Sequence, residues 1–410
     1  MPTLNKIRAA LTTHRGPLAA DPHLTPLRIA LTAFFAMDGF LFAGWVVRIP
    51  AIKAQTGAGA GTLGLALLGV SAGAVAFMMI TGRLCRRFGS HTVTTASAAA
   101  LALSIVLPPL THSATALGLV LLVFGAAYGS LNVAMNSAAV DLIGALRRPV
   151  MPSFHAAFSL GGMLGAGLGG LVAGSLPPTV HLTLLAVLGL LVTAVAGRSL
   201  HTHPAPVVPE RRTAAAESRP SSGRAGRGRR LVVVFGLIAL CTAYGEGAMA
   251  DWGALHLTQD LAAGPGTAAA GYAVFALAMT VGRLSGTALV QRFGAARALI
   301  AGGTTATAGM LLGALAPTVW AAGAGFAVAG LGLANIFPIA IARAGEAGGP
   351  DGVAVASTVG YGGMLLGPPA IGFLAEAAGL PLALTTVALL AAVAAGIAYV
   401  TRGAHHTACR

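Results

Sequence analysis

The sequence predicts an all-α integral membrane protein with twelve transmembrane helices arranged in two pseudo-symmetric six-helix bundles. Hydrophobic residues make up 56% of the 410 residues and charged residues only 9%, whereas a soluble domain carries about 25% charged residues. Apolar runs of about 20 residues, the length that crosses a hydrocarbon core, recur along the whole chain. With so few charges the chain cannot cover a water-facing surface, so lipid must be its main solvent.

The apolar runs fall into two sets of six. The first set is 27–47, 61–82, 92–110, 115–140, 153–175 and 179–198. The second set is 231–256, 266–290, 298–316, 319–343, 353–377 and 380–401. Residues 1–26 lack a short apolar core followed by a small-residue cleavage site, so we expect no removable signal peptide and assign the first run to helix 1.

Positive charge is distributed unequally between the two sides of the predicted membrane. All but three of the 25 Lys and Arg residues fall on one side; the exceptions are Arg48, Lys53 and Arg283. This asymmetry follows the positive-inside rule, so we expect both terminal segments, 1–26 and 402–410, in the cytoplasm of a protein of the cytoplasmic membrane. No basic folded face remains for nucleic acid, despite the formal net charge of +14.

The segment 199–230 differs in composition from the rest of the chain. It is rich in Pro, Ser, Gly and Arg, which cannot bury an apolar core, and it is predicted to be a cytoplasmic linker. It separates an N-terminal bundle, 27–198, from a C-terminal bundle, 231–401. We expect residues 205–225 of the linker to carry no transport function.

The two halves resemble each other at an offset near 200 residues. LGGMLGAGLGGLVAG at 160–174 returns as YGGMLLGPPAIGFLA at 361–375. GSLNVAM at 129–135 matches GLANIFP at 332–338, which places Asn132 opposite Asn335. The repeat indicates a duplicated membrane bundle.

The glycines of the first repeat also fit a G-x-G-x-x-G pattern, but no strand precedes them, so a dinucleotide-binding turn is rejected. Gly161, Gly165 and Gly169 are four residues apart and form one small-residue stripe on a helix. Such a stripe lets a neighbouring helix approach closely. We expect it to pack between the two bundles.

The segment 82–89, GRLCRRFG, resembles the loop between helices 2 and 3 of the major facilitator superfamily, roughly G-x-L-a-D-R-x-G-R-R. Arg86 stands where that family has Asp, so the usual acid-to-helix contact that latches the outward-open state is altered. FHAAFSLGGMLGA at 154–166 and EGAMADW at 246–252 resemble a bacterial subgroup near the fucose-permease-like transporters. The residues of the loop that are candidates for gating are Gly82, Arg83, Arg86, Arg87 and Gly89.

The resemblance implies a central cavity lined mainly by helices 1, 4, 7 and 10, with contributions from helices 2, 5, 8 and 11. The two bundles would rock about a site near the midplane and expose it to each side in turn. Helices 3, 6, 9 and 12 would face lipid. A monomer that binds a small solute, and no cofactor or metal, is expected.

Three carboxylates in the spans are candidates for proton coupling, because a charge inside a membrane is costly and is usually functional. Asp38 lies about 15 Å into helix 1, and Glu246 and Asp251 lie about 22 and 30 Å into helix 7. Glu246 is expected to be the main coupling group, with Asp38 as its partner or as a solute ligand. A purely structural role stays open for both, and Asp251 is expected near the external mouth, in a gate ion pair with Arg48 or in contact with solute.

Two basic side chains in the spans have competing roles. Arg283 fits either a structural clamp at the cytoplasmic face, which we favour, or a contact with an anionic solute. His155 fits an interhelical hydrogen bond better than a proton relay, although it titrates near neutral pH.

Amide and aromatic side chains are candidates for solute binding. Asn132 and Asn136 share one face of helix 4. The full set of candidates is Asn132, Asn136, Asn335, Trp45, Tyr244, Trp252 and Tyr361. Interhelical bonding for the amides, and interfacial anchoring for the tryptophans, are the alternatives.

The function predicted from these features is secondary active transport, driven by protons. No Walker A sequence occurs, so an ATP-driven pump is not expected, and no H-E-x-x-H, G-x-S-x-G or metal-spaced cluster supports an enzyme. Transport without coupling stays open. Symport of a small polar nutrient and antiport of a drug or metabolite both fit the sequence.

Overall fold

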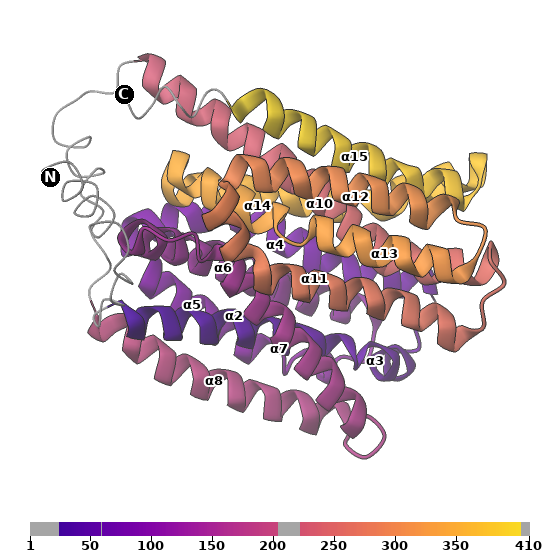
Figure 1. Ribbon diagram of the computed structural model, residues 1–410. Coiled ribbons are helices and arrows are strands. Elements are labelled where there is room, and N and C mark those ends of the chain that lie inside the picture. The colour runs from indigo at the N-terminus through magenta and orange to yellow at the C-terminus, as the bar shows by residue number, and fades with distance from the viewer. Residues whose placement is uncertain (1–23, 59, 204–221, 403–410) are drawn as a thin grey trace, which may run out of the picture.

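The computed structural model describes residues 24–58, 60–203 and 222–402, and within them every regular element is a helix (Figure 1). The first half contains α2 (Thr25–Val46), α3 (Ile49–Thr56), α4 (Ala60–Phe88), α5 (Ser90–Ser104), the short 3-10 helix η1 (Pro108–Leu110), α6 (Ala114–Leu146), α7 (Met151–Val172) and α8 (Pro178–Thr202). The second half contains α10 (Ser222–Gln259), α11 (Pro265–Phe293), α12 (Ala295–Leu315), α13 (Val319–Leu333), α14 (Ile336–Ala378) and α15 (Leu380–Thr401).

Eleven helical stretches of the described residues are long and apolar enough to cross a membrane. The longest, Val319–Ala378, contains two crossings, because Gly349 interrupts α14 with a non-helical backbone (φ 60°, ψ −148°). Residues on the two sides of this break face each other: a Cβ on Gly345 would lie 2.9 Å from the Val353 side chain. The count is therefore the twelve spans that the sequence predicts.

Tight turns end corresponding helices in the two halves. α4 and α11 each end in Arg-Phe and are followed by a glycine, and Gly89 and Gly294 have φ of 84° and 82°. Glycine adopts this positive φ without the steric cost that a side chain would bring. The repeated sequence thus produces a repeated turn, as a duplicated bundle requires.

The two halves lie side by side, with α8 and α15 at opposite outer edges (Figure 1). Within them, α2 packs on α7 and α4 on α6, as α10 packs on α14 and α11 on α13. The halves touch each other through α4 with α14, α7 with α11, and α6 with α14. We call the end of the molecule where α4, α6 and α11 finish the basic end, because Arg86, Arg147 and Arg292 lie there.

Helices extend into the predicted linker 199–230 from both sides. α8 continues to Thr202 and α10 begins at Ser222. Residues 204–221, the centre of the predicted linker, lie outside the described residues. The helices outlast the apolar runs because a backbone that is already helical continues at low cost for a few polar residues beyond the lipid.

Candidate functional site

A cavity of about 560 Å³ lies between the two halves. Its described lining comes from eight spans, which correspond to helices 1, 2, 4, 5, 7, 8, 10 and 11, as the family resemblance implies. The lining residues are Phe35, Phe42, Val46, Val70, Ser71, Ala74, Tyr128, Asn132, Met135, His155, Phe158, Ala243, Glu246, Gly247, Ala250, Asp251, Tyr272, Arg283, Phe337, Tyr361 and Met364.

The cavity is open toward the end opposite the basic end. Val46, at the end of α2, and Tyr272, near the start of α11, are 42% and 40% exposed. Deeper in the wall, Asn132 and His155 are only 6% and 7% exposed. A solute that enters from this end therefore reaches Asn132 and His155 only after it has left bulk water.

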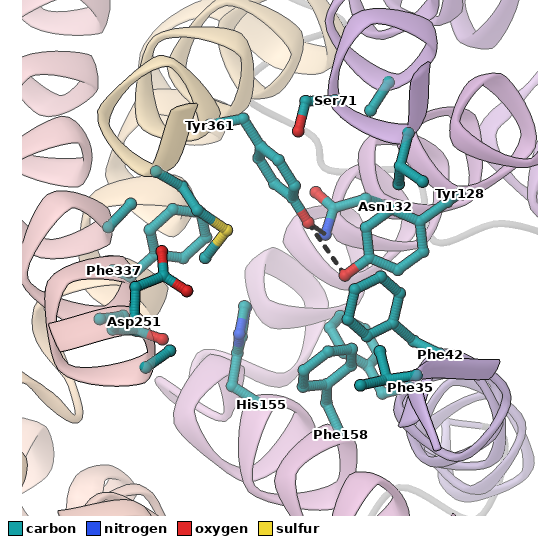
Figure 2. A pocket seen from close by; sticks show the side chains of 18 of the residues that line it. Phe35, Phe42, Ser71, Tyr128, Asn132, His155, Phe158, Asp251, Phe337 and Tyr361 are labelled. Atoms are coloured by element: carbon teal, nitrogen blue, oxygen red, sulfur yellow. Dashed lines mark hydrogen bonds between the residues drawn. The ribbon is translucent and has the colours of Figure 1, made fainter. Parts of the chain in front are cut away.

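Hydroxyl and amide groups from both halves meet at one side of the cavity (Figure 2). The Tyr361 hydroxyl on α14 donates to the Tyr128 hydroxyl on α6 at 3.2 Å, and Asn132 Nδ2 donates to the Tyr361 hydroxyl at 3.4 Å. Asn132 Oδ1 is buried without a hydrogen-bond partner among the described residues. An acceptor is thus left for a solute or a water molecule.

Aromatic rings form much of the remaining wall (Figure 2). Phe42 stacks on Tyr128 with the ring centroids 4.9 Å apart. The His155 ring lies between Phe35 and Phe337, at centroid distances of 5.4 and 5.9 Å. These faces favour a solute with a flat or apolar body.

Glu246 on α10 and Arg283 on α11 form an ion pair in the cavity wall. Arg283 Nη2 donates to both carboxylate oxygens, at 3.2 and 3.1 Å. Arg283 Nη1 donates to Ser159 Oγ on α7 at 2.6 Å, so the same guanidinium also joins the two halves. The Arg283 and Glu246 side chains are 9% and 22% exposed. Arg283 joins the two halves, as a structural clamp would, and it also lines the cavity, as contact with an anionic solute would require.

A break in helix 10 supplies a further partner for Arg283. α13 ends at Leu333 and α14 begins at Ile336, so the span is interrupted between them. Pro338 has no backbone N–H, and therefore cannot bond the carbonyl of Ala334 four residues earlier. Arg283 Nε donates to that carbonyl at 3.3 Å.

Asp38 is completely buried in the first half. Neither carboxylate oxygen has a hydrogen-bond partner among the described residues. Asp38 is nevertheless close enough to Tyr128 and Tyr361 to interact electrostatically with both. Because it is fully buried and is not among the lining residues, Asp38 lies behind the cavity wall rather than in it.

The expected ion pair between Asp251 and Arg48 does not form in this structure. Asp251 lines the cavity and is exposed, whereas Arg48 is 2% exposed. Arg48 donates to His181 Nδ1 at 2.8 Å and to the carbonyls of Ala173 and Leu176 at 3.0 Å. These carbonyls follow the end of α7, where a helix leaves acceptors unsatisfied and favours a cation. Arg48 is held within its own half for this reason.

His155 and Asn136 interact with each other across two helices of the first half. His155 Nε2 lies 3.3 Å from Asn136 Oδ1, and Asn136 Nδ2 donates to the Asn132 carbonyl at 2.8 Å. His155 lines the cavity, while Asn136 is fully buried behind it. The hydrogen bond between helices expected for His155 is present.

The other residues considered for solute binding lie away from the described cavity lining. Asn335 Nδ2 donates to the Gly282 carbonyl at 2.8 Å, and the Tyr244 hydroxyl lies 2.9 Å from Thr386 Oγ1. Trp45 is 2% exposed and packs against Phe124 at a centroid distance of 6.1 Å. Trp252 lies near Gly372. A contact between any of them and solute would require another conformation.

The basic end is closed by contacts between α4 and α14. Arg86 forms an ion pair with Asp351, and both side chains are half exposed. A Cβ on Gly82 would lie 2.9 Å from both Asp351 and Ala354, so the helices are in close contact. Asp351 was not singled out from the sequence, although it directly follows Gly-Gly-Pro at 348–350, a turn signal between two spans. The loop that segment 82–89 resembles has Asp at the position of Arg86. Here the charges are exchanged, with the cation on α4 and the acid on α14.

The remaining residues of the loop after span 2 take no part in this contact. Arg83 and Arg87 are exposed, and the Arg87 guanidinium lies 5.2 Å above the Phe88 ring. Gly89 makes the turn into α5 described above. Within this loop, Gly82 and Arg86 are therefore the residues that contact α14.

The prediction that the glycine stripe of α7 packs between the two bundles is wrong. A Cβ on Gly161 would collide with the Ala36 carbonyl, and one on Gly165 with the Phe40 carbonyl, both in α2 of the same half. Gly169 faces Val47 and His181, also in that half. The spacing correctly predicted close helix packing, but it does not identify the partner helix.

Two repeated helical halves around a cavity within the membrane-spanning region define a secondary transporter. Residues 29–342 match the model of the Major Facilitator Superfamily. The chain belongs to this superfamily and is a multi-pass membrane transporter, not an enzyme.

Bacterial relatives extend over nearly the whole chain. An uncharacterized MFS-type transporter of Yersinia pestis is 35% identical over 396 residues, which cover 94% of this chain and 98% of the relative. An uncharacterized transporter of Sinorhizobium fredii is 36% identical over 389 residues, 92% of this chain and 99% of the relative. The membrane protein MosC of Rhizobium meliloti is 32% identical over 394 residues, 94% and 93% of the two chains.

Solved structures show the same fold at low sequence identity. FucP in the outward conformation matches with a TM-score of 0.76 and 16% identity, over 92% of this chain and 98% of FucP. The human organic anion transporter MFSD10 matches with a TM-score of 0.72 and 18% identity, over 92% and 100% of the two chains. Both likenesses concern the fold alone.

Proposed function

We propose that this transporter couples the movement of a small solute to protons, and that Glu246 is the residue that takes up and releases the proton. The observation that carries the proposal is the Glu246–Arg283 ion pair in the cavity wall. A carboxylate inside a membrane is costly to keep charged, and its one basic partner can be drawn away by a solute or by movement of a helix. Glu246, no longer paired with Arg283, can then bind a proton and become neutral.

Alternating access is supported by the contacts at the two ends. The Arg86–Asp351 pair joins the halves at the basic end, while Val46 and Tyr272 at the other end are exposed. The positive-inside rule assigns the basic end to the cytoplasm, in the inner membrane of a bacterium, with both termini on the same side. In this assignment the structure is open to the outside, and opening of the cytoplasmic end would break the Arg86–Asp351 contact.

The direction of coupling separates two candidate functions. A nutrient symporter brings solute and proton in together, and is supported by the hydroxyl and amide cluster around Asn132. A drug or metabolite antiporter is supported by the aromatic wall and by Met135 and Met364. We favour symport, because Glu246 and Arg283 give the deep part of the cavity a specific polar site.

The test is proton movement in liposomes that contain the purified protein and the trapped pH dye pyranine. L-fucose, L-leucine, uridine, 1-methylnicotinamide and benzenesulfonate are added outside, one at a time. A symported solute should acidify the lumen and an exchanged one should make it alkaline. Glu246→Gln should abolish the dye signal, while Glu376→Gln, an exposed acid of α14 outside the cavity lining, should retain it. Uptake without proton movement, or an unchanged signal in Glu246→Gln, would refute the proposal.

A further inference from the structure

We infer that the solute is a small organic monoanion, and that its acid group replaces Glu246 as the partner of Arg283. The inference rests on the proposed function and adds the chemical class of the solute. When Glu246 binds a proton, the solute anion takes over the guanidinium. When the solute leaves, Glu246 loses the proton and restores the ion pair.

Arg283 is the single Lys or Arg side chain in the described cavity lining. Its ion-pair partner among the described residues is Glu246. Protonation of Glu246 therefore leaves one buried positive charge without a counter-ion, which is strongly unfavourable at a desolvated site. An anionic solute removes this penalty, so proton and anion should bind with positive coupling, and the coupling must be reciprocal.

The hydrogen bonds of Arg283 show which part of the guanidinium becomes available. Nε donates to the Ala334 carbonyl and Nη1 to Ser159 Oγ. Both acceptors are neutral and would stay in place. Nη2 makes the two bonds to Glu246. An incoming carboxylate or sulfonate can therefore take Nη2 together with the remaining N–H of Nη1, while the other two bonds keep the fork fixed.

The rest of the cavity limits the charge and shape of the solute. Asp251 lines the exposed part of the cavity and forms no ion pair among the described residues, so it opposes a second negative charge. Phe35, Phe158 and Phe337 provide apolar faces for a ring or short chain. The volume of about 560 Å³ suits one small molecule. An organic cation would be attracted by Asp251 and the rings, but Arg283 would repel it from the deep part.

Matched acid and amide probes test the inference in detergent, where passive membrane passage is irrelevant. Benzoate and benzamide, and cyclohexanecarboxylate and its amide, are titrated into wild-type protein and into Glu246→Gln, which mimics the protonated state. The acids should bind Glu246→Gln at least tenfold more tightly than wild type at pH 8. Wild-type affinity should rise by about tenfold per pH unit between pH 8 and 6, because one proton is taken up with each anion.

Three further variants provide controls. Glu246→Ala opens the same vacancy without an amide, so acids but not amides should raise its unfolding temperature. Glu246→Ala/Arg283→Met should lose that response, whereas Glu376→Gln should behave as wild type. Equal binding of acids and amides, equal stabilisation of the double variant, or failure of every acid to bind Glu246→Gln and Glu246→Ala would overturn the anion site.

The outcomes separate this inference from the proposed function. If acids bind through Arg283 but wild-type affinity is independent of pH, the anion site is supported and proton coupling through Glu246 fails. If a neutral solute or 1-methylnicotinamide drives protons through Glu246 in liposomes, coupling is supported and the anion inference is overturned.

Discussion

Asp38 of the first half lies beside the cavity wall and Glu246 of the second half lies in it, and these two acids have opposite surroundings. Asp38 of the first half is fully buried and has no hydrogen-bond partner among the described residues. Glu246 of the second half is 22% exposed on its side chain and paired with Arg283. A duplicated fold therefore does not imply duplicated chemistry.

The difference follows from how each site compensates for lost hydration. A buried ionised carboxylate without a donor is strongly unfavourable, so the packing around Asp38 accommodates the neutral acid. For Glu246, Arg283 supplies both a counter-charge and two hydrogen bonds. The second half thus carries the ionic part of the site, and the first half contributes rings and the Asn132 amide.

The largest expected effect comes from removing one member of the ion pair. Glu246→Ala should lower the free energy of unfolding by about 3–5 kcal/mol, because it leaves the Arg283 charge buried without a counter-ion. Glu246→Ala/Arg283→Met should recover a large part of this loss. The measurement is thermal and denaturant unfolding in detergent. A double variant less stable than Glu246→Ala would contradict the ion pair as the reason for the difference between the halves.

Glycine packing should be as costly in one half as in the other. A Cβ on Gly165 would collide with the Phe40 carbonyl of α2, and a Cβ on Gly363 with the Leu240 carbonyl of α10. Gly165→Leu and Gly363→Leu should each cost at least about 1–3 kcal/mol, since the helices must separate. Gly167→Leu and Gly362→Leu are matched controls, because no atom lies within 4 Å of a Cβ there. If the unfolding temperatures of controls and test variants fall equally, helix contact is not the cause.

The contact at the basic end joins a cation of the first half to an acid of the second. Arg86→Asp places two acids together, and should shift the population toward an opened basic end by about two- to fivefold, as expected for a half-exposed pair. Arg86→Asp/Asp351→Arg should restore the original distribution. Spin-label distances between the ends of α4 and α14 report the populations. No shift in the single variant, or no recovery in the double one, would show that the ion pair does not hold this end closed.

Asp38→Asn should have the smallest effect on stability. The neutral acid and the amide have similar size, and no observed hydrogen bond is lost. Its unfolding temperature should match that of wild type within error, while weaker solute binding is expected if Asp38 supports the Tyr128 and Tyr361 cluster. A large destabilisation would mean that Asp38 is ionised and has a partner that appears in another state.

The sequence was sufficient to predict the fold because hydropathy and the internal repeat are properties of the chain itself. The twelve spans, the duplicated bundle and the interior position of Glu246 all follow from patterns in the sequence. The Glu246–Arg283 pair was not predicted, since it depends on how α10 and α11 are rotated against each other. The Arg48 contacts were missed for the same reason: the charge was visible, but the free carbonyls after α7 were not.

The proline in helix 10 has a consequence for how the site is encoded. The Arg283 acceptor is a main-chain carbonyl, which any amino acid at position 334 would provide. What makes that oxygen available is the missing N–H of Pro338, four residues further on. A comparison restricted to side chains that touch the solute would overlook this position. Pro338 thus helps to orient the Arg283 guanidinium indirectly, because the helical hydrogen bond that proline cannot make leaves the Ala334 carbonyl available to Arg283.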